Sequence, residues 1–469
     1  MMKSFKTFRV LAAALPLSIA CSTMLESDDP ADDDLVVGDD KMDTPYYSTL
    51  AMELAAEFVG EIREEHESPA AANARAESLR STTESWTVAS LVDNHAKFAM
   101  NKVKSDKLHM NLNGNSLSSK DVSVSGRTVT FKYVAKTEVL VQKEDLKKAG
   151  IPLSSLNGKS TTVKVPADLR NIAQKLGTRC AEGMDAGDTP QDYNYFYYWK
   201  PDKPGCDAPM TDATLKLSSL LPKKTTYPEY NKLTEDGKIE VVVFFGAADH
   251  DEVVKESDWG MYNWRTFTRD LTSRGFRKAS DQNPGGRYTR TNRGVQVIVD
   301  VYGPRDLQAA NHDSSGIFAQ AIKTHEIILY NGHSFYGSLD VLDKKENYPE
   351  GKYQVFMFAS CWSYEYYTKQ IFENKKSAAD PNGWALADVV NNTEVTWFHN
   401  DAPASRIVLM NIIAGAESGG KDGTRNYHWG NIIDQMNRQA LQAQADHKTD
   451  SHEVWGVSGV RENKFRPKR

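Results

Sequence analysis

Past Gly237 the sequence alternates between short apolar runs and longer amphipathic stretches. Residues 239–245 form a continuous β-branched and aromatic run, Ile-Glu-Val-Val-Val-Phe-Phe, of the kind found in strands buried on both faces. Strands that alternate with helices predict an α/β fold, a mostly parallel sheet with helices on both faces. We expect strands at 239–245, 295–301, 326–330, 353–358 and 393–398, and helices at 262–273, 307–323, 364–373, 405–416 and 431–445.

The preceding segment, residues 46–210, reads as a separate α+β domain. Leu50, Leu54, Phe58 and Ile62 recur at four-residue steps, which predicts an apolar stripe on a helix. No motif in this segment carries recognisable chemistry. The expected helices are 48–65, 71–102, 143–148 and 167–176, the expected strands are 121–134 and 161–165, and 211–237 is expected to be a connection.

Residues 192–199, Asp-Tyr-Asn-Tyr-Phe-Tyr-Tyr-Trp, are unusually aromatic. Such a cluster can form a recognition surface for a peptide or glycan, but aromatic side chains of this density more often fill a core between domains. The second interpretation is the favoured one. It predicts that these rings are buried.

The first twenty residues have the pattern of a signal peptide. Three basic residues, Lys3, Lys6 and Arg9, precede an apolar run that is too short to cross a bilayer. The following Leu-Ser-Ile-Ala-Cys sequence, which ends at Cys21, resembles a lipobox. The pattern predicts an acyl group on Cys21 that holds the protein on a membrane surface, and the alternative is ordinary cleavage that leaves a free thiol.

Residues 21–45 are expected to form a solvated tether. Between positions 22 and 43 there are nine acidic residues against one lysine, a composition that cannot bury a core. Loss of the signal peptide changes the net charge from −6 to −9, and this segment carries −8 of it. The folded part is therefore nearly neutral, which argues against nucleic acid as a partner.

The four cysteines fall into three groups. Cys21 is the expected anchor. Cys180 and Cys206 flank a loop that an oxidising compartment could close with a disulfide. Cys361 is left over, either as a reactive thiol or as an inert buried one.

Two of the apolar runs end at residues suited to catalysis. The run that begins at Ile327 leads into Asn-Gly-His-Ser, with the histidine at position 333, and the run that begins at Val355 leads into Ala-Ser-Cys-Trp, with Cys361. Ligands and catalytic groups in α/β sheets gather beyond the carboxyl ends of strands. His333 and Cys361 are therefore expected to lie side by side if their strands are neighbours.

These two strand ends resemble the caspase-like cysteine peptidases, the superfamily of caspases, legumains, gingipains, clostripain and separase. The resemblance covers residues 238–460 of the domain expected at 238–469. It implies that Cys361 is the nucleophile, that His333 is the general base or acid, and that backbone N–H groups around Ser334 and Cys361 bind the oxyanion. This chain has Ser334 where the family usually has glycine, and Ser-Cys-Trp in place of the caspase Gln-Ala-Cys-x-Gly.

Other candidate residues follow other strands. Asp249 follows the first strand, where it is either a pocket residue or part of a solvated loop. His399 and Asp401 follow a later strand, where they could line a specificity pocket or orient the site. The histidines have no compact metal-ligand spacing, so no metal and no other cofactor is expected. No Gly-x-Ser-x-Gly elbow supports a serine nucleophile.

Together the patterns predict a bacterial lipoprotein of the cell envelope, anchored outside the cytoplasm, with the outer membrane as the expected location. The predicted activity is a cysteine endopeptidase that acts on a peptide or protein substrate through Cys361 and His333. The alternative is a non-catalytic surface or binding lipoprotein with the same fold.

Overall fold

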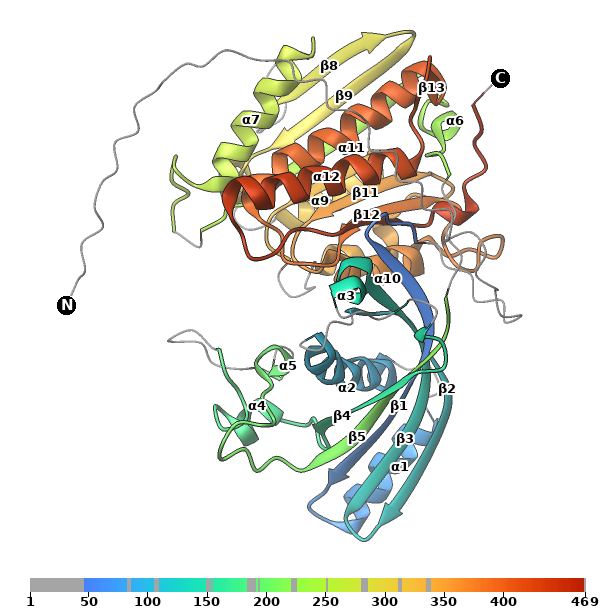
Figure 1. Cartoon of the computed structure of the whole chain (residues 1–469), viewed down its shortest axis with the longest axis vertical. Coiled ribbons are helices and arrows are strands. Elements are labelled where there is room, and N and C mark those ends of the chain that lie inside the picture. Colours follow the sequence, from blue (N-terminus) through green and yellow to red (C-terminus); the bar gives the residue numbers. More distant parts are fainter. Residues whose placement is uncertain are drawn as a thin grey trace, which may run out of the picture. The chain divides into compact units, whose positions relative to one another are not determined.

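The computed structural model contains two large β-sheets, each with its own helices, in the chain from residue 46 onward (Figure 1). The signal sequence, Cys21 and the acidic segment lie outside the described residues. Those residues are 46–81, 86–104, 109–148, 152, 155–183, 191–192, 195–220, 226–249, 252–279, 286–310, 314–334 and 339–467.

The C-terminal sheet has eight strands in the order β15-β12-β11-β10-β6-β9-β8-β7. Its five central strands, from β12 to β9, run parallel, and β15, β8 and β7 are antiparallel to their neighbours. The strands are β6 (Lys238–Phe245), β7 (Arg277–Lys278), β8 (Arg287–Asn292), β9 (Val295–Tyr302), β10 (Ile327–Asn331), β11 (Gln354–Ala359), β12 (Ala387–Asn392) and β15 (Trp455–Ser458).

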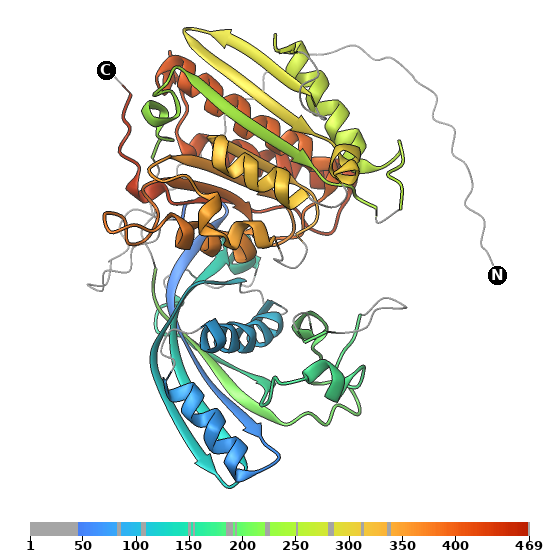
Figure 2. The ribbon, with the colours of Figure 1, turned by 180° about the vertical axis from the view of Figure 1, so that it is seen from behind.

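Helices cover both faces of this sheet, and the alternation of side chains along β6 shows how. Val241 and Val243 pack in one core with residues of α7, α11 and α12, and Val242 and Phe244 pack in a second core with α9 and α10 (Figures 1 and 2). A mixed α/β fold is therefore confirmed. The elements are α6 (Tyr230–Leu233), α7 (Trp259–Ser273), α8 (Pro304–Ala309), α9 (Ser314–Thr324), α10 (Ser363–Lys375), α11 (Phe398–Ser418), α12 (Trp429–His447), the 3-10 turns Asp340–Asp343, Lys345–Asn347 and Val460–Glu462, and the hairpin β13 (Lys421–Asp422) and β14 (Arg425–Asn426).

The N-terminal sheet has five antiparallel strands in the order β2-β3-β1-β5-β4. Helices α1 and α2 pack into its single core (Figure 1). The elements are β1 (Ala51–Glu65), α1 (Pro69–Ser81), α2 (Trp86–Lys104), β2 (His109–Ser125), β3 (Thr128–Gln142), α3 (Lys143–Lys148), β4 (Ser160–Pro166), α4 (Ile172–Leu176), α5 (Tyr195–Tyr198) and β5 (Met210–Leu220).

The helix expected over residues 48–65 is wrong, because this segment is the central strand β1. Leu54, Phe58 and Ile62 are at most 1% exposed. A four-residue spacing places side chains on one side of a strand as well as on one side of a helix, since four is a multiple of the strand period of two. Pairing with β3 on one side and β5 on the other makes the segment a strand, and its apolar stripe packs in the core that includes α1 and α2.

Five other expected segments differ from the structure. The connection expected at 211–237 contains most of β5, whose alternate residues Ala213, Leu215 and Leu217 are buried, so the N-terminal sheet extends beyond residue 210. The strand expected at 393–398 lies earlier, as β12. The helices expected at 71–102 and 307–323 are each two helices, and the one expected at 167–176 is shortened to α4.

The aromatic segment belongs mostly to the N-terminal core. Tyr195, Phe196 and Trp199 are at most 5% exposed, so the rings are buried as expected, but they lie in the core of the N-terminal half and not between domains. Tyr197 stacks on Trp362, with ring centroids 5.9 Å apart. This ring pair joins the N-terminal half to the residue that follows Cys361.

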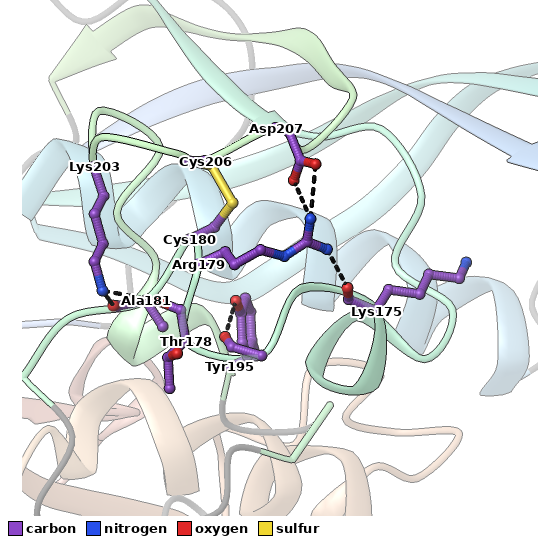
Figure 3. The surroundings of a disulfide bond; sticks show 10 residues. Lys175, Thr178, Arg179, Cys180, Ala181, Tyr195, Lys203, Cys206 and Asp207 are labelled. Atoms are coloured by element: carbon purple, nitrogen blue, oxygen red, sulfur yellow. Dashed lines mark hydrogen bonds and ion pairs between the residues drawn. A yellow bond between two sulfur atoms is a disulfide. The ribbon is translucent and has the colours of Figure 1, made fainter.

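The predicted disulfide between Cys180 and Cys206 is present and closes a sequence separation of 26 residues (Figure 3). Arg179 donates twice to the Asp207 carboxylate at 2.7 Å, and Lys203 donates to the carbonyl oxygens of Thr178 and Ala181. These bonds hold the two ends of the loop together beside the disulfide. Figure 3 shows them on both sides of the sulfur atoms.

A buried carboxyl group lies where the two halves meet. Glu53 of β1 is 3% exposed, accepts a hydrogen bond from the Tyr364 hydroxyl, and its Oε2 has no partner among the described residues. Burial, and next the charge of Glu138, raise the pKa of Glu53 well above its usual range. Burial therefore favours the protonated form of this carboxyl group in the folded protein.

Glu53→Gln is expected to stabilise the protein at pH 8 and to leave it nearly unchanged at pH 4. The folded-state pKa of Glu53 is raised, so its stabilising contribution is full below the unfolded-state pKa and is lost as the pH rises toward the folded-state pKa. A gain of about 1 kcal/mol or more at pH 8 should appear in urea unfolding of wild type and variant at both pH values. An equal difference at the two pH values would contradict the assignment.

Candidate functional site

The site lies at the carboxyl ends of β10 and β11, which are parallel neighbours. Asn331 at the end of β10 pairs with Ala359 at the end of β11. His333 and Cys361 each stand two residues beyond this pair. Parallel strands end at the same edge of the sheet, so the register brings these two residues to equivalent positions on adjacent strands.

A glycine shapes the turn that carries His333. Gly332 has a φ of 151°, and a Cβ at this position would lie 3.1 Å from the Tyr330 hydroxyl and 3.3 Å from the Gly246 Cα. The Tyr330 hydroxyl also donates to the His333 carbonyl oxygen at 2.8 Å. The chain therefore leaves β10 in a conformation and a space that favour glycine.

The imidazole of His333 is held by a backbone carbonyl. Its Nε2 lies 3.0 Å from the Ala248 oxygen, and its ring meets the Phe398 ring edge-on at a centroid distance of 5.3 Å. A carbonyl oxygen only accepts, so we assign the proton of the neutral ring to Nε2. Nδ1 is then the basic nitrogen.

Asp258 holds the loop that supplies this carbonyl. Its buried carboxylate accepts from the backbone N–H groups of Ala248 and Asp249 at 2.9–3.2 Å. The same carboxylate caps α7 by accepting from the N–H groups of Gly260 and Met261. Asp258 thus fixes the peptide on which His333 rests.

Cys361 stands in the tight turn between β11 and α10. The next residue, Trp362, is left-handed, with φ 50° and ψ 33°, a conformation that costs energy for a bulky side chain. The Ser363 hydroxyl donates to the Phe358 carbonyl oxygen at 2.8 Å and accepts from the Asn392 N–H at 2.9 Å. These bonds hold the strained turn that presents the half-buried free thiol.

The surroundings of Cys361 favour the neutral thiol over the thiolate. Burial raises its pKa, the N–H of Thr396 at 3.5 Å from Sγ opposes this, and the charges of Asp401 and Glu453 raise the pKa further. The thiol is therefore protonated at neutral pH. Attack on a carbonyl requires a base that removes the proton.

Asp401 and Glu453 are two buried acids near this thiol. Asp401 is 2% and Glu453 0% exposed, and burial raises the pKa of both. Glu453 accepts from the Trp397 N–H at 3.0 Å. The expected pocket residue Asp401 is thus near enough for its charge to act on the Cys361 thiol, as is Glu453, which the sequence did not single out.

Ser334 contributes to the site through its backbone N–H and carbonyl groups and not through its hydroxyl. It is 8% exposed, and its carbonyl oxygen accepts from the Tyr367 hydroxyl. In the described part of the chain its own N–H makes no hydrogen bond. The Ser334 N–H therefore has no acceptor among the described residues.

The other expected pocket residues are placed differently. Asp249 is exposed and contributes its backbone N–H to Asp258. His399 stacks on His447 at 3.9 Å, and its pKa is lowered by burial and by the charge of His447. Neither side chain is shown in contact with Cys361 within the described residues.

The described residues hold no cluster of side chains suited to a metal ion. His325 has a structural partner, Asp300, at 3.2 Å, and Arg287 donates twice to the same carboxylate at 2.8 Å. Nor does any described helix have the length and apolarity to cross a membrane.

Two residues of the site were missed from sequence. An aspartate directly before a helical stretch is the usual N-cap signal, so Asp258 could have been found by this rule. Glu453 stands in an irregular segment before β15, and only the tertiary fold brings it to the site. No local pattern marks such a residue.

Comparison with known proteins gives no relative for this chain. No family model, no curated protein and no solved structure matches it. The function must therefore be argued from the site.

Proposed function

We propose that the protein is a cysteine endopeptidase in which Cys361 is the nucleophile and His333 the general base. The observation that carries the proposal is the register of β10 and β11, which places both residues two positions beyond the paired strand ends. The caspase-like resemblance rests on the same two strand ends. Ser334 and the bulky Trp362 remain departures from the family pattern.

The reaction begins with proton transfer. His333 Nδ1 takes the proton of the Cys361 thiol as Sγ attacks the carbonyl carbon of the scissile peptide bond. The carbonyl oxygen becomes an oxyanion, which the N–H groups of Ser334 and Cys361 would stabilise. The imidazolium then donates its proton to the leaving nitrogen as the C–N bond breaks, which leaves a thioester on Cys361.

Hydrolysis of the thioester completes the cycle. His333 removes a proton from water, the hydroxide oxygen attacks the thioester carbonyl, and the proton passes to Sγ as the carboxylic acid product departs. The Ala248 carbonyl supports both half-reactions, because it accepts from Nε2–H in the neutral ring and in the imidazolium. The raised pKa of Cys361 fits a nucleophile that is activated only as the proton is removed.

The rival is a non-catalytic surface or binding lipoprotein. The observation that favours it is the same raised pKa of Cys361, since an inert buried cysteine has this property too. Incubation of the mature protein with a peptide library, followed by mass spectrometry of the products, separates the two. The peptidase proposal expects cleavage products, and an unchanged library supports the rival.

We also propose that the mature protein is anchored through Cys21 on the outer face of a bacterial membrane, with the outer membrane as the expected location. The disulfide between Cys180 and Cys206 supports an oxidising compartment outside the cytoplasm. The acidic segment after Cys21 would serve as the tether.

Metabolic labelling with a fatty-acid analogue should mark the wild-type protein and not Cys21→Ser. The reason is that the acyl chains are attached to the cysteine that becomes the new N-terminus. Cell fractionation provides the control, because the Cys21→Ser protein should leave the membrane fraction. Equal labelling of both proteins would show that Cys21 is not the anchor.

A further inference from the structure

The turn that carries Cys361 is strained at the next residue. Trp362 is left-handed, with φ 50° and ψ 33°, a conformation that bulky side chains rarely adopt. A residue in such a conformation stays there only where the surrounding structure holds it. Because Trp362 follows Cys361 directly, a change in its backbone angles would change the direction in which the Cys361 side chain leaves the turn.

One contact that holds Trp362 comes from the aromatic segment of the N-terminal half. Tyr197 of α5 stacks on the Trp362 ring, with the centroids 5.9 Å and the planes 29° apart. Tyr197 packs against the N-terminal core and also against the core that contains residues of α9 and α10, where Trp362 itself packs. The stack therefore limits the movement of the Trp362 side chain.

Tyr197 is held in turn by the residues on either side of it. The Tyr195 hydroxyl donates to the Gly177 carbonyl oxygen at 2.7 Å (Figure 3). Trp199 forms an antiparallel β-bridge with Ala181, which lies in the disulfide loop. Both side chains are buried in the N-terminal core. The segment that presents Tyr197 is therefore fixed at both ends.

A second contact from the N-terminal half reaches the loop that binds the Trp362 backbone. The Trp362 N–H donates to the Glu394 carbonyl oxygen at 2.9 Å. The Glu394 carboxylate accepts from the side-chain amide of Gln142, at the end of β3. Two residues further along this loop, the Thr396 N–H lies 3.5 Å from Sγ of Cys361. The ring and the backbone of Trp362 are thus both linked to the N-terminal half.

We propose that Tyr197 is a positioning residue for the peptidase. By stacking on Trp362, it holds the strained turn in the conformation that presents Sγ of Cys361 for attack. The N-terminal half then acts on the reaction through this turn. The inference rests on the proposed peptidase function, because it takes Cys361 as the attacking group.

Kinetics of a substrate found in the peptide library test this role. Tyr197→Ala should lower kcat at least about tenfold and change KM less than about twofold, because a small misplacement of the reacting atom slows the reaction without altering the surface that binds substrate. Tyr197→Phe keeps the stacked ring and should restore kcat to within about twofold of wild type. Tyr197→Leu fills the space without a flat ring and should show the loss even if the alanine variant does not fold.

Tyr198→Ala is the matched control. Tyr198 belongs to the same helix and packs against the N-terminal core, so its removal loosens α5 without removing the stack. Its kcat should stay near that of wild type. An equal loss of kcat in Tyr197→Ala and Tyr198→Ala would mean that any loosening of α5 has this effect, which overturns the positioning role.

A double-mutant cycle tests the route through Trp362. Trp362→Ala also removes the stack, so Tyr197→Ala should lower kcat less than about twofold further in that background. Losses that multiply in full would show that Tyr197 acts by another route, and the proposal would be wrong.

Alkylation of Cys361 by iodoacetamide in the folded proteins gives a readout that needs no turnover. Cleavage with a kcat that Tyr197→Ala leaves unchanged overturns the positioning role and leaves the peptidase. If wild type cleaves no peptide, but Tyr197→Ala and not Tyr198→Ala exposes the half-buried thiol to faster alkylation, the peptidase is overturned and Tyr197 still holds the turn. Neither cleavage nor a change in alkylation overturns both.

Discussion

Cys361→Ala is expected to lower the rate of peptide cleavage by a factor on the order of 10³ or more, and His333→Ala by a similar factor. Alanine at position 361 removes the atom that forms the thioester. Burial and nearby acids raise the pKa of the Cys361 thiol. Alanine at position 333 removes the base that would take its proton. Rates of substrate hydrolysis by the purified variants provide the measurement.

The double variant should be almost as active as either single one, because residues that act as one catalytic unit are not additive. Asp422→Asn replaces an exposed carboxylate on β13 (Lys421–Asp422) and is the control, with an activity near that of wild type. Cleavage that persists in Cys361→Ala would mean that another residue is the nucleophile.

Removal of the disulfide is expected to have the largest effect on stability. Cys180→Ser combined with Cys206→Ser should lower the free energy of unfolding by about 3 to 4 kcal/mol, the size that loop closure predicts for this separation. Cys180 is fully buried in the N-terminal core, so the loss should fall on that half. Denaturant unfolding of both proteins, with and without a reductant, measures the effect.

The reductant serves as the control in this experiment. It should destabilise the wild-type protein to the level of the double variant and should leave the double variant unchanged. A double variant as stable as the oxidised wild type would mean that the hydrogen bonds of Arg179 and Lys203 hold the loop without the disulfide.

The α/β half could be predicted because its central strands are continuous apolar runs. Every residue of β10 and β11 is buried. A short continuous apolar run that is bounded by turns fits few structures other than a buried strand. The same rule failed for β12. Its sequence contains Asp388, Asn391 and Asn392, which are fully buried, and Asp388 Oδ2 accepts hydrogen bonds from the distant Tyr353 and Trp429. Polar residues with long-range partners conceal a buried strand.

The N-terminal half was harder to predict for a different reason. The four-residue stripe of β1 fits a helix and a strand equally, and only its neighbours β3 and β5 decide between them. These strands are distant in sequence, with β5 beginning at Met210. Local periodicity cannot supply such pairing.

The part of the candidate site that lies at the ends of β10 and β11 could be predicted from sequence. His333 and Cys361 follow directly from two apolar runs, and the register shows that these two strand ends are neighbours. The acid Glu453 and the carbonyl of Ala248 reach the site from other segments of the chain. Their roles depend on tertiary contacts, so a single sequence does not reveal them.

The most direct test of the dyad is the rate at which Cys361 of the folded protein reacts with peptidyl acyloxymethyl ketones, measured by mass spectrometry. These electrophiles bind as substrates do and require an activated thiol. We expect rapid labelling of wild type, labelling at least about 100-fold slower in His333→Ala, and equal labelling of both by a simple alkylating agent in urea. Equal rates in the two folded proteins, or labelling of wild type only after unfolding, would contradict the proposed mechanism.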